Sequence, residues 1–257
     1  MLPHDIIDSR TPLTGTTRMP AAPTLDSVMR ELAAKANPTA KNTYIRHGAP
    51  EPLFGVRIGD LKPLQKKLKG QQELALELYA TKNSDAMYLA GLIADGSKMT
   101  RRQLNQWANS ATWHLIADCT VPWVAADHPA AVEIAAKWID SRKEFTAAAG
   151  WSTLACVAAS VPDEDLPIKQ FDALLKRCVK SLHASPNRVR YSMNNFVICV
   201  GTYVAPLAEK AMAAATKIGT VKVDMGQTEC KVPEAASYIR KSRQGKPVAP
   251  KRKTTRC

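Results

Sequence analysis

The positions of proline limit most strongly what this chain can fold into. Pro122, Pro129, Pro167, Pro186 and Pro206 each stand at or near the start of a segment whose apolar residues recur at helical spacing. A proline is tolerated in the first turn of a helix, because the amide hydrogen that it lacks would have no partner there. The sequence therefore predicts a succession of helices separated by short polar turns.

The apolar spacing also predicts where these helices begin and end. Thr24 precedes the first helix and is expected to cap it with its hydroxyl oxygen, and Ser97 or Thr100 can cap a later one. The segment TVKVDMG at 220–226 alternates briefly, which is typical of extended chain. We expect helices at 25–36, 58–68, 71–81, 84–95, 99–109, 111–119, 122–127, 130–141, 144–160, 166–183, 187–203, 205–218 and 233–241.

The composition favours closely packed helices over sheets. Only 6% of the residues are aromatic, whereas alanine recurs in runs such as 147–149 and 211–216. Alanine has the highest helix propensity and is depleted in strands. We therefore expect an all-α protein in which residues 23–240 form one α-solenoid of degenerate HEAT-like helical repeats. A closed globular helix bundle is the alternative.

The net charge of +13 is concentrated at one end of the chain. Residues 240–257 contain eight Lys or Arg and no Asp or Glu, which leaves +5 on the other 239 residues. Glycine and proline interrupt this segment. We expect residues 241–257 to be a basic disordered tail that attracts phosphates or only aids solubility, and residues 1–22 to be irregular.

Nothing in the sequence indicates secretion or a membrane. Residues 1–22 carry Asp5 and Asp8 and lack an apolar run, unlike a signal peptide. No stretch of about 18 uncharged apolar residues occurs. The six cysteines form no C-x-x-C pair, and several lie in apolar helical surroundings, where a free thiol acts as a small hydrophobic group. We expect a reduced, cytoplasmic protein.

The stretch TWHLIADCTVPWVAADHP at 112–129 is crowded with side chains that can do chemistry. A metal site is one interpretation, because His114, Asp118, Cys119 and His128 are all possible ligands. On a helix, however, His114 and Asp118 share a face, while Cys119 points about 100° away. Pro122 separates all of them from His128. We therefore expect no metal, and most apolar residues of the stretch can be core.

Two motifs resemble a known family. WHLIADCTVP at 113–122 is similar to the tryptophan pair, aspartate and Val-Pro of the DNA alkylation repair, or AlkD-like, DNA glycosylases, which are built from HEAT-like repeats. GVRIGDLKPLQKKL at 55–68 is similar to the family's segment of glycine, apolar and basic residues that opens a helix. The resemblance spans roughly residues 25–218.

The resemblance implies roles for particular residues. Asp118 falls on the catalytic aspartate, and Trp113 on the first tryptophan of the pair. Candidates for contacts around the lesion are Trp113, His114, Trp123, Asn195 and Phe196. Candidates for phosphate contacts are Lys62, Lys66, Arg101, Arg102, Arg188 and Arg190. Trp107, Trp138 and Trp151 lie in apolar helical patterns and are expected to be core.

The sequence departs from the family pattern at three places. His114 stands at the second tryptophan, Thr146 and Ala147 stand where the family has an arginine for phosphate contact, and Asn195 or Phe196 stands at a later tryptophan. These departures motivate a second hypothesis, in which the chain is a non-catalytic DNA-binding scaffold of the same fold.

The leading hypothesis is a monofunctional DNA glycosylase. The family implies excision of cationic N3- or N7-alkylated purines from duplex DNA without base flipping, with Asp118 stabilising positive charge on the deoxyribose in the transition state. It also implies a monomer that needs no cofactor. A third hypothesis is a helical-repeat module that binds protein. No phosphate-binding glycine loop or nucleophile and base arrangement is present.

Overall fold

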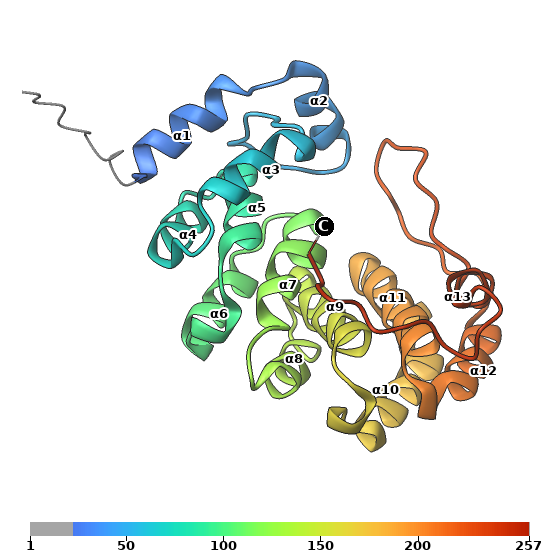
Figure 1. Cartoon of the computed structure of the whole chain (residues 1–257). Helices are drawn as coiled ribbons and strands as arrows, with labels where there is room; N and C mark the ends of the chain where they lie inside the picture. Colours follow the sequence, from blue (N-terminus) through green and yellow to red (C-terminus); the bar gives the residue numbers. More distant parts are fainter. Residues whose placement is uncertain (1–22, 257) are drawn as a thin grey trace, which may run out of the picture.

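The computed structural model describes residues 23–256, and within this range the protein is all-α. The thirteen α-helices of residues 23–256 follow one another along a curved path from α1 to α13 (Figure 1). Their bounds are α1 Leu25–Ala34, α2 Pro38–Arg46, α3 Ile58–Lys67, α4 Gln72–Ala80, α5 Ser84–Ile93, α6 Arg101–Asn109, α7 Val121–Ala125, α8 Ala131–Trp138, α9 Glu144–Ser160, α10 Ile168–Ser181, α11 Asn187–Tyr203, α12 Ala208–Ile218 and α13 Ala235–Arg243.

Five shorter helical segments complete the path. Four are 3-10 turns, and the fifth is a π-helical turn that runs directly into α7. The 3-10 turns are Gly96–Lys98, Asp163–Asp165, Leu182–Ala184 and Ala205–Leu207, and the π turn is Ile116–Thr120. No strand occurs among residues 23–256. The all-α prediction is confirmed, and TVKVDMG belongs to an irregular loop between α12 and α13.

Hydrophobic packing forms two core clusters along the solenoid. One joins α1 to α8, and the other joins α8 to α13. Helix α9 lies between them and is buried on nearly every side. Its small residues permit this position, since a Cβ at Gly150 would lie 2.8 Å from the backbone nitrogen of Ile139. Trp107, Trp138 and Trp151 are buried, as the sequence predicts.

Polar side chains cap the helices where the sequence predicts them. Thr24 forms a capping box with Ser27 at the start of α1, and Thr100 forms one with Gln103 at the start of α6. Each box satisfies amide groups that have no partner inside the helix. Helix α2 was not predicted, although Asn37 accepts a hydrogen bond from the backbone of Ala40 and Pro38 stands at its first position.

A buried carboxylate holds the loop before α3. Asp85 at the start of α5 accepts hydrogen bonds from the backbone amides of Phe54, Gly55 and Val56 at 2.6, 3.0 and 2.8 Å. Burial raises the pKa of Asp85, and these amides oppose that shift. The segment that opens GVRIGDLKPLQKKL is thus fixed to the core by a residue 30 positions later.

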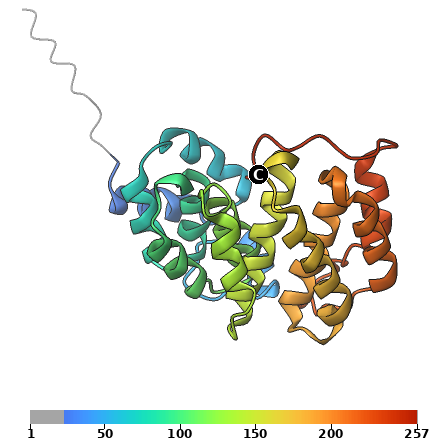
Figure 2. The same cartoon turned by 90° about the horizontal axis from the view of Figure 1, so that it is seen from below.

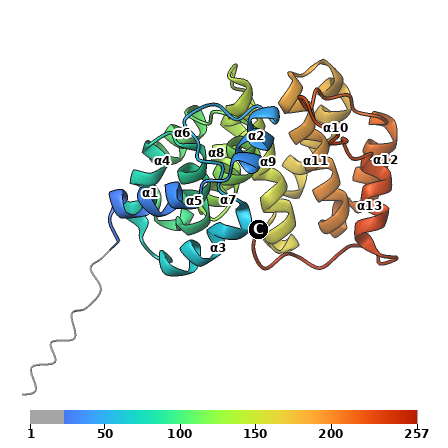
Figure 3. The ribbon, with the colours of Figure 1, turned by 90° about the horizontal axis from the view of Figure 1, so that it is seen from above.

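The basic tail is ordered to the end of the described range, which contradicts the prediction of a disordered arm. After α13 it runs back toward the middle of the chain (Figures 2 and 3). The backbone amide of Ala249 donates to Thr202 and that of Arg252 to Ala159, both at 2.8 Å. The ammonium of Lys251 bonds the carbonyl of Ala158 and the carboxylate of Asp163.

Helix carbonyls explain this order. The last carbonyls of a helix lack partners within it and carry partial negative charge. Lys251 and Arg252 meet those at the end of α9, and Arg256 meets those at the end of α5. The basic residues that suggested disorder therefore attach the segment to the helix ends. We call residues 246–256 the C-terminal strap.

Within residues 23–256, no single helix is both long and apolar enough to span a membrane. The bent pair Asn187–Tyr203 and Ala205–Ile218 meets that test only when its two parts are taken together. The expectations for residues 1–22 lie outside the described residues.

Candidate nucleic-acid interface

The π-helical turn Ile116–Thr120 places Asp118. Pro122 follows and has no amide hydrogen, so the carbonyl of Asp118 cannot receive the regular α-helical bond. A wider turn accommodates this gap, and single π turns of this kind are common at functional sites. The sequence predicted an interruption at Pro122, and in the structure the turn continues into α7 without a break.

Asp118 is buried in a polar cluster that joins three elements. Its Oδ2 lies 2.6 Å from Nη2 of Arg188 on α11. Its Oδ1 accepts hydrogen bonds from the hydroxyls of Ser192 at 2.8 Å and Ser152 at 3.4 Å. The side chains of Asp118 and Arg188 are 9% and 10% exposed. Both carboxylate oxygens are therefore occupied by protein donors.

In this pairing the positive charge of Arg188 neutralises the negative charge of Asp118. Burial raises the pKa of the Asp118 carboxyl, while the guanidinium of Arg188 and the two serine hydroxyls act against that shift. A carboxylate that stabilises an oxocarbenium ion needs its negative charge directed at the sugar. Here the positive charge of Arg188 already lies against it.

A cavity of about 470 Å³ opens beside this cluster. Arg188 lines the cavity, whereas Asp118 is not among its lining residues, so the guanidinium lies nearer to any ligand than the carboxylate does. The other walls are the end of α2, the aromatic residues before the π turn, the start of α9 and the α12–α13 loop. We call this the groove site, lined by Ile45, Arg46, His47, Gly48, Trp113, His114, Phe145, Arg188, Asp224, Met225, Gly226 and Gln227.

His114 contributes an uncharged ring to the groove site. Its pKa is lowered to about 4, mainly by burial and also by the neighbouring Arg188 and His47. Its ring centroid lies 6.0 Å from that of His47 and 5.0 Å from that of Trp113. At neutral pH the ring of His114 therefore adds no positive charge to the groove site.

The α12–α13 loop, residues 219–234, closes one side of the groove site. Asn187 at the start of α11 clamps it, since its side chain accepts a hydrogen bond from the amide of Asp224 and donates one to the carbonyl of the same residue. The loop reaches α2 at Gly226, where a Cβ would lie 2.7 Å from the carbonyl oxygen of Arg46. Glycine is required there, both by this contact and by its φ of +74°.

The structure separates the predicted aromatic contacts. Trp113 and His114 line the groove site. Trp123 is buried edge-on against Tyr88, and Phe196 is fully buried between Trp151 and Phe171. Those two predictions are wrong, because the apolar faces of α7 and α11 turn these rings into the core.

Asn195 lies half-buried on α11 and is not among the residues that line the groove site. Its side-chain oxygen faces the thiol of Cys199 at 4.0 Å.

The predicted phosphate contacts are also spread over several places. Arg188 is paired with Asp118, and Arg190 donates to Asn187 at 3.2 Å. Arg101 forms a two-point ion pair with Glu133. Arg102 is exposed on α6. Lys62 and Lys66 are exposed on α3 and line a different cavity from the groove site.

Sequence reasoning missed several residues of the site. Ser192 could have been noticed, because it lies one helical turn after Arg188 and shares its face. Ser152 and Phe145 lie on α9 and His47 follows α2, so no local spacing connects them to Asp118. Among residues 23–256 no three His, Cys, Asp or Glu side chains gather as a metal site would require. His128 instead accepts a hydrogen bond from the amide of Ala130.

The chain resembles known proteins over most of its length. Residues 28–239 match the model of a family described as DNA alkylation repair enzyme. The uncharacterized protein Lin0241 of Listeria innocua is 37% identical over 226 residues, covering 86% of this chain and 97% of that protein. The uncharacterized protein Lmo0209 of Listeria monocytogenes is 36% identical with the same coverage.

A solved structure is similar in both sequence and fold. It is 36% identical, has a TM-score of 0.83, and covers 91% of this chain and 99% of that chain. It is described as a new family of proteins related to the HEAT-like repeat DNA glycosylases with affinity for branched DNA structures. The predicted HEAT-like architecture is therefore confirmed.

Proposed function

Because the chain belongs to the DNA alkylation repair enzyme family, we propose that it is a DNA-binding protein of this family that recognises branched DNA and does not release alkylated bases. The observation that carries the proposal is the buried ion pair between Asp118 and Arg188. It occupies the carboxylate that the family mechanism would use.

Electrostatics supports this proposal. Catalysis requires an interaction that is stronger in the transition state than in the ground state. A deoxyribose with developing positive charge would approach the groove site from the side of Arg188, and like charge would repel it. A DNA phosphate at the same place is attracted instead. The groove site therefore favours binding over cleavage of the glycosidic bond.

The similar solved structure supports the choice of DNA. That protein is described as having affinity for branched DNA structures, and 36% identity over 91% of this chain links the two closely. We extend this affinity to the present chain. Since its relatives are from bacteria, we propose that it acts in the bacterial cytoplasm and as a monomer.

A glycosylase is the second candidate. The observation in its favour is that Asp118 is kept at the position that resembles the catalytic aspartate, next to a cavity large enough for part of a nucleotide. If DNA binding drew Arg188 onto a phosphate, the guanidinium would no longer neutralise the negative charge of Asp118.

Two assays on the purified protein separate the candidates. The first measures release of 3-methyl- and 7-methylpurines from methylated duplex DNA, with a known alkylbase glycosylase as positive control and Asp118→Asn as matched variant. The second measures affinity for a four-way junction and for a linear duplex of the same arm sequence. We expect no release and tighter binding of the junction.

Release by the wild type that disappears in Asp118→Asn would reject the proposal in favour of the glycosylase. Equal affinity for junction and linear duplex would reject branched DNA as the ligand. Absence of binding to either at low salt would reject a DNA partner altogether.

A further inference from the structure

A second cavity lies where the C-terminal strap meets α3 and the end of α5. Its volume is about 510 Å³. Segments that are far apart in the sequence form it, and the last of them is the strap, which was expected to be disordered. We call it the strap site, lined by Lys62, Gln65, Lys66, Lys69, Gly70, Gln72, Leu92, Ile93, Ala94, Asp95, Lys98, Asp127 and Arg256.

Three lysines dominate the strap site, Lys62 and Lys66 on α3 and Lys69 in the turn that follows it. Lys62, Lys66 and Lys69 are exposed, and none of them has a polar partner among residues 23–256. Lys67 lies on another face of the same helix and is paired with Glu31 at 2.8 Å. Like charges three and four residues apart on a helix repel one another. An anion bound between the three lysines would remove that repulsion.

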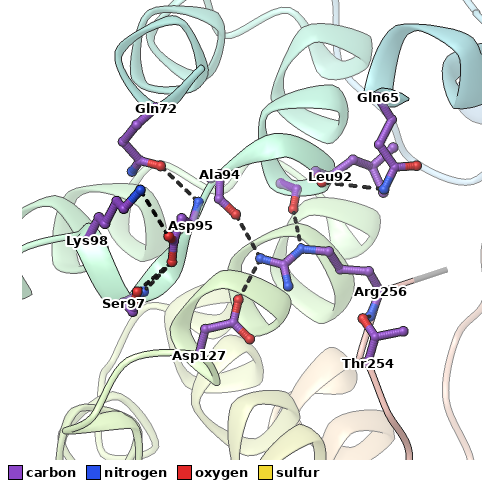
Figure 4. A network of polar contacts seen from close by, with 11 residues as sticks. Gln65, Gln72, Leu92, Ala94, Asp95, Ser97, Lys98, Asp127, Thr254 and Arg256 are labelled. Carbon is purple, nitrogen blue, oxygen red and sulfur yellow. Dashed lines mark hydrogen bonds and ion pairs between the residues drawn. The ribbon is translucent and has the colours of Figure 1, made fainter. Parts of the chain in front are cut away.

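The acidic residues of the strap site are already engaged. Arg256 bonds the carboxylate of Asp127 at 2.7 Å, and it also bonds the carbonyls of Gly91 and Ala94 (Figure 4). Asp95 accepts hydrogen bonds from Ser97 and lies 3.5 Å from the ammonium of Lys98. The positive charge that remains unpaired belongs to Lys62 and Lys66 of α3 and to Lys69 just after it.

The strap site also contains one amide donor without a partner among the described residues. Gln72 accepts a hydrogen bond from the amide of Asp95 through its side-chain oxygen, which leaves its NH₂ group as a donor (Figure 4). The nitrogen of that group is buried and has no partner among the described residues. A buried donor without a partner is costly, and a ligand with acceptor oxygens would satisfy it.

The strap site and the groove site lie at different places on the molecule. The two cavities share no lining residue, and in Figure 3 helix α3, which lines the strap site, lies along the lower edge while α2, whose end lines the groove site, lies in the upper half. One straight duplex that lies along the groove site would leave the strap site available to another arm. A branched DNA offers several arms at fixed angles to one another.

We propose that the strap site binds the phosphate backbone of a second duplex arm, so that a branched DNA engages both sites at once. The inference rests on the proposed function. It assigns to Lys62, Lys66 and Lys69 the preference for branched over linear DNA. The C-terminal strap completes the wall of this site through Arg256.

The test is the variant Lys62→Ala/Lys66→Ala/Lys69→Ala in the full-length protein. Affinity for a four-way junction and for a linear duplex is measured between about 50 and 200 mM salt, because affinity that comes from phosphate contacts falls steeply over this range. We expect junction affinity to fall by at least roughly tenfold, with a much smaller loss on the linear duplex. The slope of log affinity against log salt for the junction should flatten by roughly 2 to 3, because each phosphate contact contributes about 0.9.

Two controls accompany the triple variant. Lys169→Ala/Lys180→Ala/Lys217→Ala removes the same charge from exposed positions on and near α10 and α12, and Lys67→Ala removes the paired lysine of α3. Both should keep the junction preference. An unchanged circular dichroism spectrum confirms that each variant is folded.

The outcomes separate the inference from the proposed function. A wild type that binds the junction tightly, with a triple variant that binds it equally well, overturns the inference and leaves the proposed function standing. Equal losses in both triple variants overturn it as well, since net charge alone would then explain binding. Saturable binding of inorganic phosphate at this site, with unchanged junction affinity in the variant, would assign a small anion instead of DNA. A wild type without junction affinity overturns both.

Discussion

Asp118 and Arg188 are 70 residues apart in the chain, and their side chains meet at 2.6 Å in the interior. The pair connects the π turn before α7 to the first turn of α11. Arg188 also fixes the start of α11 through its backbone amide, which donates to the carboxylate of Glu144. The pair therefore holds the π turn and α11 together, and it also neutralises the carboxylate that a glycosylase would need at the groove site.

Replacing Arg188 with methionine should destabilise the protein by about 3 to 5 kcal/mol, because the buried charge of Asp118 loses its partner. The double variant Asp118→Asn/Arg188→Met should recover part of that loss, since no uncompensated charge remains. Urea denaturation of the three proteins measures both quantities. Arg102→Met, on the exposed face of α6, is the matched control. A loss of less than about 1 kcal/mol in Arg188→Met would mean that the pair is not closed in solution.

Stability should depend on pH through His114. Its pKa in the folded protein is about 4, below its ordinary value of 6.5. The fold therefore favours the neutral ring, and the unfolded chain binds the extra proton between these two values. Stability that is present above pH 6.5 is lost as the pH falls toward 4, by roughly 3 kcal/mol for this residue.

His114→Gln should remove this part of the pH dependence. The difference in unfolding free energy between variant and wild type, measured from pH 7 to pH 4, reports it without the contribution of the other acidic groups. An NMR titration in which the ring of His114 gains its proton near pH 6.5 would contradict the prediction.

Asp85→Ala should destabilise the loop before α3. It removes the acceptor of three backbone amides in a place where water cannot replace it. Each buried donor left without a partner costs about 1 to 3 kcal/mol, so a total loss of roughly 3 kcal/mol or more is expected. Thermal unfolding measures the loss, with the exposed Glu164→Ala as control. A melting temperature within about 2 °C of the wild type would show that the loop does not need this carboxylate.

Arg256→Ala should cost about 2 kcal/mol, because a charged donor leaves two helix carbonyls and Asp127. Arg252→Ala is a matched control, since its side chain is exposed and only its backbone takes part in the strap. Hydrogen exchange should show faster exchange at the end of α5 in Arg256→Ala alone. The same exchange pattern in both variants would contradict the role assigned to the guanidinium.

The sequence predicted the helices well because their signals are local. Helical spacing, prolines in first turns and the caps Thr24 and Thr100 are read within a few residues. Helices α9 and α11 begin and end at the predicted residues. Helix α2 was missed because it has no fully buried residue and hence no apolar stripe.

The site was less predictable because its decisive contacts are not local. Asp118 was identified by its neighbours in the chain, but its partner Arg188 was assigned to phosphate. No pattern in either segment predicts that Asp118 and Arg188 are in contact. The ordered conformation of the C-terminal strap could not be predicted either, because most of its partners are backbone carbonyls, which every residue type carries.

The C-terminal strap also changes how such a stack of helices should unfold. In a repeat protein each unit contacts only its neighbours, so stability is nearly a sum of adjacent terms and an end can fray independently. The strap joins the last helix to α9 and α5, across several intervening units. A chain closed in this way should melt in one cooperative transition. The curvature of the solenoid, and with it the distance between the groove site and the strap site, should be kept until the whole protein unfolds.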